Sequence, residues 1–295
     1  MAGPLPPPMP VTHYENFPVA SVLLPHYLRQ PIAAIYWFAR SADDLADEGD
    51  HPATWRLAAL DGYRRELDAI AAGVPGASVD LQWQRLRNVI AEHRLPLGLF
   101  RDLLNAFAQD VVQTRYSDFA ELERYCRRSA NPVGRLLLHL FGQTSERDLR
   151  DSDAICTSLQ LLNFCQDAAI DWQKDRIYFP QDEMRACGVT EAHFAHGMAD
   201  IHWQRLFMLQ LDRALASLRT GSGLAQRLPG RSGLELRAIV AGGERIGARL
   251  RASGGDVFRR RPLLTRGDWV LIMLRALRVW PAARATVRGA PAASR

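Results

Sequence analysis

The sequence predicts an all-α protein. Its periodic segments are rich in Ala, Leu and Arg, which are good helix formers, and Gly and Pro stand mainly between those segments. No sustained alternation of β-branched residues, the pattern typical of strands, is found. The chain has 295 residues, 47% of them hydrophobic and 23% charged, which is ample material for a core. No internal repeat or long linker divides it, so we expect a single helical domain.

The expected helices follow one another along the chain, with glycine or proline between them. A short apolar helix is predicted at 19–28, where Pro25 could introduce a kink, and Pro31 starts the next helix, at 32–47. Helical periodicity continues after it, and further helices are expected at 53–72, 79–94, 97–113, 118–130, 135–141, 148–173, 190–219, 232–252 and 266–280.

The two ends of the chain differ from its helical middle. Residues 1–12 are rich in proline and lack the basic start and apolar centre of a signal peptide, so we expect a disordered tail. The helical domain is expected at 13–282, followed by a flexible tail at 283–295. No stretch reaches the roughly 18 apolar residues that a membrane-spanning helix needs.

The chain is basic, with a formal net charge of +5 and a pI of about 9.3. Such a balance suits nucleic acid, an anionic membrane or an anionic substrate. No nucleic-acid-binding motif accompanies the charge, so we expect no nucleic-acid partner. The apolar segment 269–280 contains two arginines; it is typical of a core helix, and peripheral contact with a membrane is the alternative.

Cysteine spacing gives no support to zinc or thioredoxin-like sites, because no C-x-x-C pair occurs among Cys126, Cys156, Cys165 and Cys187. We expect reduced, buried thiols and a cytoplasmic protein.

An acidic stretch ends the helix expected at 32–47. Asp43 and Asp47 are four residues apart and share one face, whereas Asp44 and Glu48 point away from it. The helix dipole disfavours negative charge at this end, and a bound cation would offset that cost. The stretch therefore indicates a cation site, against the alternative of a solvated helix end.

A second acidic face is expected on the helix at 148–173. Gln160, Asn163, Asp167 and Asp171 form a polar stripe on an otherwise apolar helix, which favours a cavity lining over a solvent face. Two such faces across a cavity would hold divalent cations, and Mg²⁺ usually binds carboxylates together with substrate phosphates. We therefore expect a Mg²⁺-dependent enzyme that acts on a diphosphate.

Two further side chains lie on the face of Asp43 and Asp47. Arg40 could form a surface ion pair, or it could bind a diphosphate, since the guanidinium fork matches phosphate oxygens. Tyr36 is ordinarily a core aromatic, yet at this place its ring could stabilise a carbocation.

These residues resemble the squalene/phytoene synthases. The resemblance rests on Tyr36…Arg40…Asp43-Asp44-x-x-Asp47 and on Asn163-x-x-x-Asp167-x-x-x-Asp171-x-x-x-x-Arg176-x-Tyr178-x-Pro180. It extends from His13 to about Leu277, and includes His13…Phe17 and Tyr125-Cys126…Val133-Gly134.

The resemblance implies the all-α isoprenoid synthase fold, with helices around a central apolar tunnel. It implies a Mg²⁺ (or Mn²⁺) cluster on Asp43, Asp47, Asp167 and Asp171. It also implies that the diphosphate is held by Arg40, Arg176 and Arg260. The remaining substrate and catalytic positions that it implies are His13, Phe17, Tyr36, Tyr125, Gln160, Asn163 and Gln166.

Two departures narrow the resemblance. Members that condense two prenyl diphosphates usually have arginine where this chain has Gln166, and Ala-Gly where it has Asn131-Pro132. Both features resemble the bacterial hopanoid branch, which converts presqualene diphosphate to hydroxysqualene by water capture. That reaction needs no NADPH. The expected partners are presqualene diphosphate and the other enzymes of the pathway.

Two alternatives stay open. One is a squalene or phytoene synthase that condenses two prenyl diphosphates head to head. The other is a non-catalytic family member that acts as an assembly factor; such members tend to lose the aspartates, and all four are present here.

Overall fold

The computed structural model describes residues 25–76 and 78–278. Within these residues the chain is helical and has no strand, apart from an isolated β-bridge between Arg115 and Ile177. The all-α prediction is therefore confirmed. The helices are α1 (His26–Asp47), α2 (Ala53–Ala72), α3 (Leu81–His93), α4 (Leu97–Val112), α5 (Phe119–Ser129), α6 (Asn131–Leu140), α7 (Glu146–Gln173), α8 (Gln181–Cys187), α9 (Glu191–His196), α10 (Ile201–Gly221), α11 (Leu224–Arg227), α12 (Gly230–Ala252) and α13 (Arg266–Arg278).

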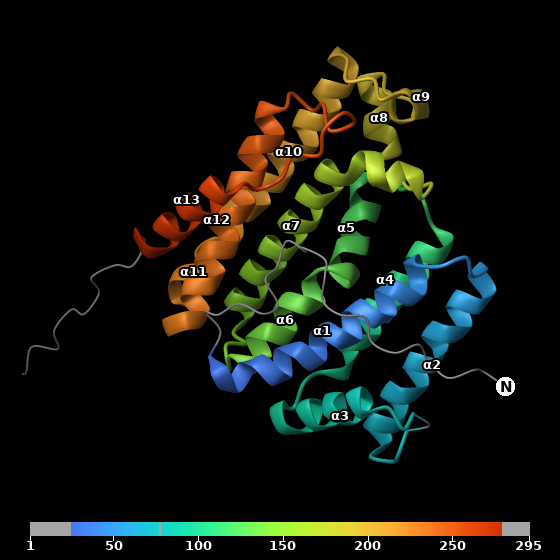
Figure 1. Ribbon diagram of the computed structural model, residues 1–295, viewed down its shortest axis with the longest axis vertical. Coiled ribbons are helices and arrows are strands. Elements are labelled where there is room, and N and C mark those ends of the chain that lie inside the picture. Colours follow the sequence, from blue (N-terminus) through green and yellow to red (C-terminus); the bar gives the residue numbers. More distant parts are fainter. Residues whose placement is uncertain (1–24, 77, 279–295) are drawn as a thin grey trace, which may run out of the picture.

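The helices are arranged around α7, which lies near the middle of the molecule between α5 and α10 (Figure 1). One part of the apolar core is formed by helices α1, α2, α3, α4 and α6. A second part is formed mainly by α5, α7, α8, α9, α10 and α12. Helices α1 and α7, which carry the two acidic faces, thus belong to different parts of the core.

Helix α1 forms because its apolar residues recur at helical spacing on one side. Ile35, Phe38 and Ala42 are buried, and the Phe38 ring packs edge-on against Phe100 with 5.1 Å between ring centroids. This packing turns the opposite face of α1, which carries Asp43, away from the core that α1 shares with α2, α3 and α4. Asp43 is only partly buried.

Helix α7 begins at a side-chain cap and ends in a tight turn. The Ser145 hydroxyl accepts a hydrogen bond from the Asp148 backbone N–H, which satisfies a free donor of the first turn. After Gln173 the chain reverses, with Asp175 at a φ of 55° and the Arg176 N–H donating to the Asp171 carbonyl at 2.8 Å. This turn directs the residues that follow α7 toward the end of α1.

Two predicted helix starts are wrong. Pro31 does not start a helix but lies inside α1, as its sixth residue. It is buried there, and its missing N–H removes only the hydrogen bond to the Tyr27 carbonyl. The helix expected at 135–141 begins instead at Asn131, with Pro132 in the first turn, a position that proline favours.

The helix expected at 190–219 is divided in two. Gly197, at a φ of 60°, ends α9, and the Asp200 carboxylate caps α10 by accepting from the His202 and Trp203 N–H groups. Helices α8 and α11 were not expected. The tails at 1–12 and 283–295, and most of the helix expected at 19–28, lie outside the described residues.

None of the described helices is both long enough and apolar enough to cross a membrane.

Candidate active site

Asp47, the last residue of α1, connects the two acidic motifs. Both of its carboxylate oxygens accept hydrogen bonds from the Arg176 guanidinium, at 2.6 and 3.0 Å, and Lys174 lies 3.1 Å away. Burial raises the pKa of Asp47, but these two cations outweigh burial and hold it below its usual range. The ends of α1 and α7 are therefore joined by an ion-pair network.

Asp167, on α7, is bound by an arginine from a distant loop. The Arg261 guanidinium contacts both carboxylate oxygens of Asp167, whose side chain is only 13% exposed. Arg261 belongs to the loop between α12 and α13, so this loop reaches back across α7. The neighbouring Arg260, which the family resemblance implied as a diphosphate ligand, is exposed.

Asp171 lies one turn beyond Asp167. No hydrogen bond or ion pair joins its carboxylate to another described residue. Burial, together with the nearby charges of Asp167 and Asp47, raises its pKa well above its usual value. Three carboxylates from two helices therefore lie close enough to repel one another.

These carboxylates fit a magnesium ion. No three carboxylate, histidine or cysteine side chains in residues 25–76 and 78–278 already converge as a metal cage. Mg²⁺ does not require one, because it usually binds one or two carboxylates and fills its remaining positions with phosphates and water. A cation would also neutralise the repulsion that acts on Asp171. Asp43, one turn before Asp47, could add an oxygen ligand.

Arg40 lies on the same face of α1. Its guanidinium is 2.8 Å from Asp44 and 3.4 Å from Asp43, so it bridges the first two aspartates of the motif. Tyr36 precedes it by one turn and is partly buried, as are Gln160 and Asn163 on α7. These three side chains are thus neither fully buried nor fully exposed, and their roles in the site stay predictions.

A buried polar cluster around Asp110 contacts Arg176. Asp110, on α4, is only 8% exposed and accepts a 2.6 Å hydrogen bond from the Tyr125 hydroxyl and a longer one from Tyr178. Burial raises the pKa of Asp110 to about 7. The Asp110 backbone carbonyl accepts from Arg176 at 3.0 Å. Tyr125 thus acts, through Asp110, on the position of Arg176.

Gln166 is buried beside Asp167. Its side chain is almost fully enclosed, and its amide donates a 2.6 Å hydrogen bond to the Pro262 carbonyl. This bond ties the loop that carries Arg261 to α7. His13 and Phe17 lie outside the described residues.

Asp110, Lys174 and Arg261 were not among the site residues predicted from the sequence. Asp110 had a detectable signal, because it is the one carboxylate in the apolar run 103–112 and shares the helical spacing of the buried Leu103 and Phe107. Arg261 had none beyond its place in a basic run.

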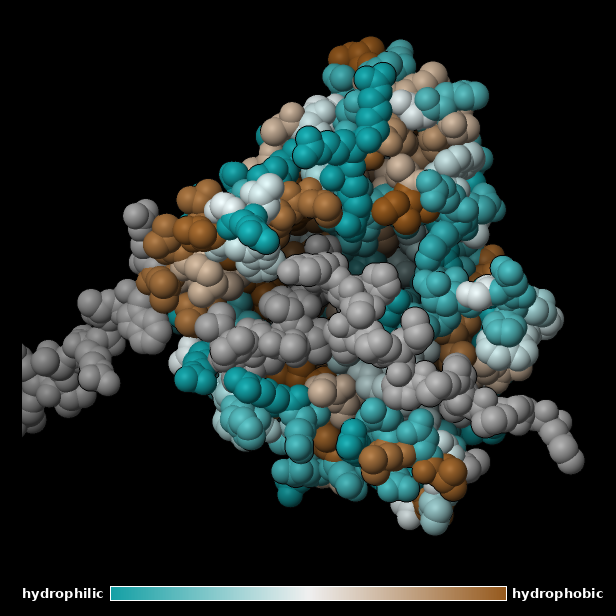
Figure 2. Space-filling view, viewed as in Figure 1, coloured by the Kyte–Doolittle hydropathy of each residue, from teal (hydrophilic) through white to brown (hydrophobic). Residues whose placement is uncertain are grey.

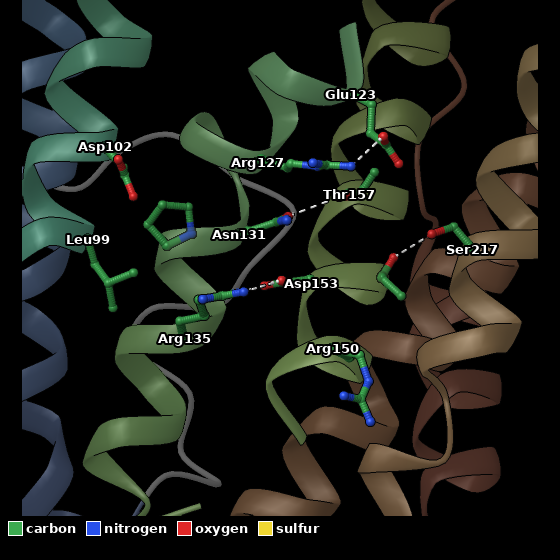
Figure 3. Close-up of a pocket in the computed structure, with 12 residues that line it drawn as sticks. Leu99, Asp102, Glu123, Arg127, Asn131, Arg135, Arg150, Asp153, Thr157 and Ser217 are labelled. Carbon is green, nitrogen blue, oxygen red and sulfur yellow. Dashed lines mark hydrogen bonds and ion pairs between the residues drawn. The ribbon is translucent and has the colours of Figure 1, made fainter. Parts of the chain in front are cut away.

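A separate cavity of about 570 Å³ lies between α4, α5, α6, α7 and α10 (Figure 3). None of the four aspartates lines it. Its charges are largely paired internally, since Arg135 binds both oxygens of Asp153 and Arg127 binds Glu123. Asn131, at its wall, accepts from the Thr157 hydroxyl at 2.9 Å. The cavity is therefore distinct from the aspartate site.

Known proteins resemble this chain over most of its length. Residues 11–268 match the squalene/phytoene synthase family model. A hydroxysqualene synthase of Zymomonas mobilis is 36% identical over 230 residues, which cover 76% of this chain and 75% of that protein. A 15-cis-phytoene synthase of Synechococcus elongatus is 32% identical over 212 residues, which cover 68% of each chain.

The structural comparison agrees. The crystal structure of the squalene synthase HpnC from Alicyclobacillus acidocaldarius has a TM-score of 0.76 and 37% identity, and the match covers 82% of this chain and 90% of that one. The expected isoprenoid synthase fold is thereby confirmed, and the chain is an enzyme that uses a prenyl diphosphate. The chain belongs to the squalene/phytoene synthase family.

Proposed function

We propose that the enzyme is a hydroxysqualene synthase. Its substrate is presqualene diphosphate, whose carbon–oxygen bond to the diphosphate breaks with the electron pair leaving on the diphosphate. The resulting cyclopropylcarbinyl cation rearranges and its ring opens, water adds its oxygen to the cation, and the water's surplus proton passes to solvent. The products are hydroxysqualene and diphosphate. The similarity to a hydroxysqualene synthase at 36% identity supports this reaction.

One observation carries the choice of reaction, namely the state of Gln166. Condensing members of the family usually have arginine at this position, and that cation would help to hold a second diphosphate. Here the side chain is a neutral amide, buried and engaged by the Pro262 carbonyl. It adds no positive charge to the site. One preformed thirty-carbon diphosphate needs only one such site.

The four aspartates are proposed to hold the metal. Asp43, Asp47, Asp167 and Asp171 supply the hard oxygen ligands that Mg²⁺ prefers. The family is typically dependent on a divalent metal. When bound, Mg²⁺ would neutralise charge on the departing diphosphate.

The surrounding side chains are proposed to bind substrate and protect the cation. Arg40, Arg176 and Arg260 would hold the diphosphate, and Arg261 would join them, since it already lies at Asp167. The proposed cavity-facing residues, which orient the chain and exclude water until capture, are His13, Phe17, Tyr36, Tyr125, Gln160, Asn163 and Gln166.

The cellular setting follows from the substrate. A thirty-carbon diphosphate is poorly soluble, so we place the enzyme in the cytoplasm, at the inner face of the membrane, near the enzymes that make presqualene diphosphate and use hydroxysqualene. Water supplies the final nucleophile, and the reaction therefore needs no hydride from NADPH.

The test is product identification. Purified enzyme with presqualene diphosphate and Mg²⁺ should give hydroxysqualene by mass spectrometry, and farnesyl diphosphate alone should give no squalene. Conversion of farnesyl or geranylgeranyl diphosphate to presqualene diphosphate, squalene or phytoene would instead favour the condensing alternative, which the similarity to a phytoene synthase keeps in view. No turnover of any of these substrates would favour the assembly-factor alternative.

A further inference from the structure

Helix α13 presents large apolar side chains to solvent. Val270, Leu274 and Leu277 are 60%, 45% and 50% exposed and follow one another at spacings of four and three, so they form a stripe along one face. Leu271 and Trp269 flank the stripe and are 47% and 39% exposed. A helix on the surface of a protein in water normally carries polar residues here.

The opposite face of α13 fixes this orientation. Asp268 is 1% exposed, forms ion pairs with Arg245 and Arg249 of α12, and accepts a hydrogen bond from the Thr265 hydroxyl. Ile272 and Ala276 are each 1% exposed and continue the buried side. Turning the apolar stripe inward would expose this buried side, so the outward stripe is a fixed feature of the fold.

Positive charge surrounds the stripe. Arg266 is exposed and lies on the same face, one turn before Val270, while the exposed Arg259 and Arg260 lie in the loop that leads into the helix. From Arg259 to the C-terminus the sequence has nine arginines and one carboxylate side chain, Asp268. The net side-chain charge of this stretch is therefore more positive than the net charge of the whole chain, which is +5.

Figure 2 shows the hydrophobic surface over α13, beside hydrophilic surface on the neighbouring part of the molecule. Apolar side chains next to arginines, with Asp268 as the only carboxylate on the helix and buried, are typical of a helix that lies in the interface of an anionic bilayer. Arginine side chains at the edge can extend to lipid phosphates while the apolar side chains enter the acyl region.

We propose that α13, with the loop residue Arg259, docks the enzyme on the surface of a membrane that contains anionic phospholipid. A second copy of this chain fits the face less well. A two-fold contact would set the same patch against itself, arginine against arginine. The proposed surface is argued from exposure and charge and does not depend on which reaction the enzyme catalyses.

Vesicle flotation tests the proposal. Full-length protein is mixed with vesicles of phosphatidylcholine alone or with about one third phosphatidylglycerol, an anionic lipid. We expect binding only to the anionic vesicles, and release in about 1 M salt, where the Debye length is about 3 Å. The triple variant Val270→Glu, Leu274→Glu, Leu277→Glu should bind at least about tenfold more weakly, because it replaces the apolar stripe with repelling charge.

A matched control separates the surface from total charge. Val79, Ile201 and Leu209 are 92%, 71% and 42% exposed and lie outside α13, so replacing all three with Glu changes the net charge equally. Although its net charge changes by the same amount, this control should bind anionic vesicles with an affinity within about threefold of that of the unmodified protein. Both variants should retain the helical circular dichroism spectrum.

Three results would overturn the proposal. One is failure of the unmodified protein to bind anionic vesicles, and another is equal loss of binding in the two triple variants. The third is an unmodified protein that binds no vesicles and is dimeric by light scattering, where the triple variant of α13 is monomeric and the control variant stays dimeric. That result would assign the face to a second copy of the chain.

Discussion

Each aspartate of the site has a different electrostatic partner. Asp47 is bound by Arg176 and Lys174, and Asp167 by Arg261. For Asp171, burial and the charges of Asp167 and Asp47 raise the pKa, and the charges of Arg176 and Lys174 only partly oppose that rise. The cations bind Asp47 and Asp167, and those at Asp47 hold its pKa below the usual range. They also place positive charge where a diphosphate would arrive. The site is thus prepared for both a metal and an anion.

Asp167→Asn should abolish turnover without unfolding the protein. The change keeps the shape of the side chain but removes its charge, which weakens both the proposed metal site and the ion pair with Arg261. We expect a loss of at least about 100-fold in kcat, measured by diphosphate release, with an unchanged circular dichroism spectrum. Asp212→Asn is a matched control, because Asp212 pairs with Arg251 on the exposed surface. An Asp167→Asn protein that unfolds would point to a structural role.

Asp110 should make stability depend on pH. Its pKa rises from an ordinary value of 3.8 to about 7 in the folded protein. Between these values the folded protein holds a proton that the unfolded chain releases, so rising pH should destabilise the fold. The slope should be at most about 1.4 kcal/mol per pH unit.

Asp110→Asn has no proton to lose and should remove this component. Urea unfolding at about pH 5 and pH 8 should therefore show the variant gaining stability relative to the unmodified protein as the pH rises. Parallel pH profiles for the two proteins would show that Asp110 titrates normally.

At the scale of elements, the loop between α12 and α13 is part of the site because Gln166 holds it on α7. Gln166→Leu removes the donor to the partly buried Pro262 carbonyl and should cost about 1–2 kcal/mol of the free energy of unfolding. It should also raise KM, since Arg261 loses its support. Gln173→Leu, an exposed position on the same helix, should change stability by less than about 0.5 kcal/mol. Equal stability of the two variants would refute the role of this hydrogen bond.

Helical periodicity predicted most elements well, because amphipathic spacing is a local property of the sequence. The helices at 53–72 and 97–113 correspond to α2 and α4 within one residue. The helix start predicted at Pro31 was wrong because the destabilisation by proline depends on its position in the helix, and burial of Pro31 in the core offsets it. Gly197 and Asp200, by contrast, were local signals that could have divided the helix expected at 190–219.

At the scale of the whole molecule, the site lies between α1 and α7, which belong to different parts of the core. Asp47 and Arg176 are separated by 129 residues and Asp167 and Arg261 by 94, so their contacts arise from tertiary packing. The sequence could identify the aspartates from their spacing on each helix. It could not identify Arg261 over Arg260, because that choice depends on the path of a loop. Lys174 and Arg176 reach Asp47 only because α7 ends in the turn at Asp175.

Ligand binding should stabilise the entire fold. Mg²⁺ with inorganic diphosphate should raise Tm, because it binds the folded protein and relieves the repulsion among Asp47, Asp167 and Asp171. At about 100 times Kd the gain is about 2.7 kcal/mol. Removal of the metal with EDTA should reverse the shift, and Asp167→Asn should show little of it. An unchanged Tm on addition of Mg²⁺ and diphosphate would argue against this metal site.

The reaction in ¹⁸O-labelled water tests the central claim most directly. Presqualene diphosphate is incubated with enzyme and Mg²⁺ in labelled water, and the product alcohol is analysed by mass spectrometry. Ionisation followed by water capture predicts hydroxysqualene that carries the heavy oxygen. Unlabelled presqualene alcohol, formed by cleavage of the phosphorus–oxygen bond, or squalene as the main product would contradict it.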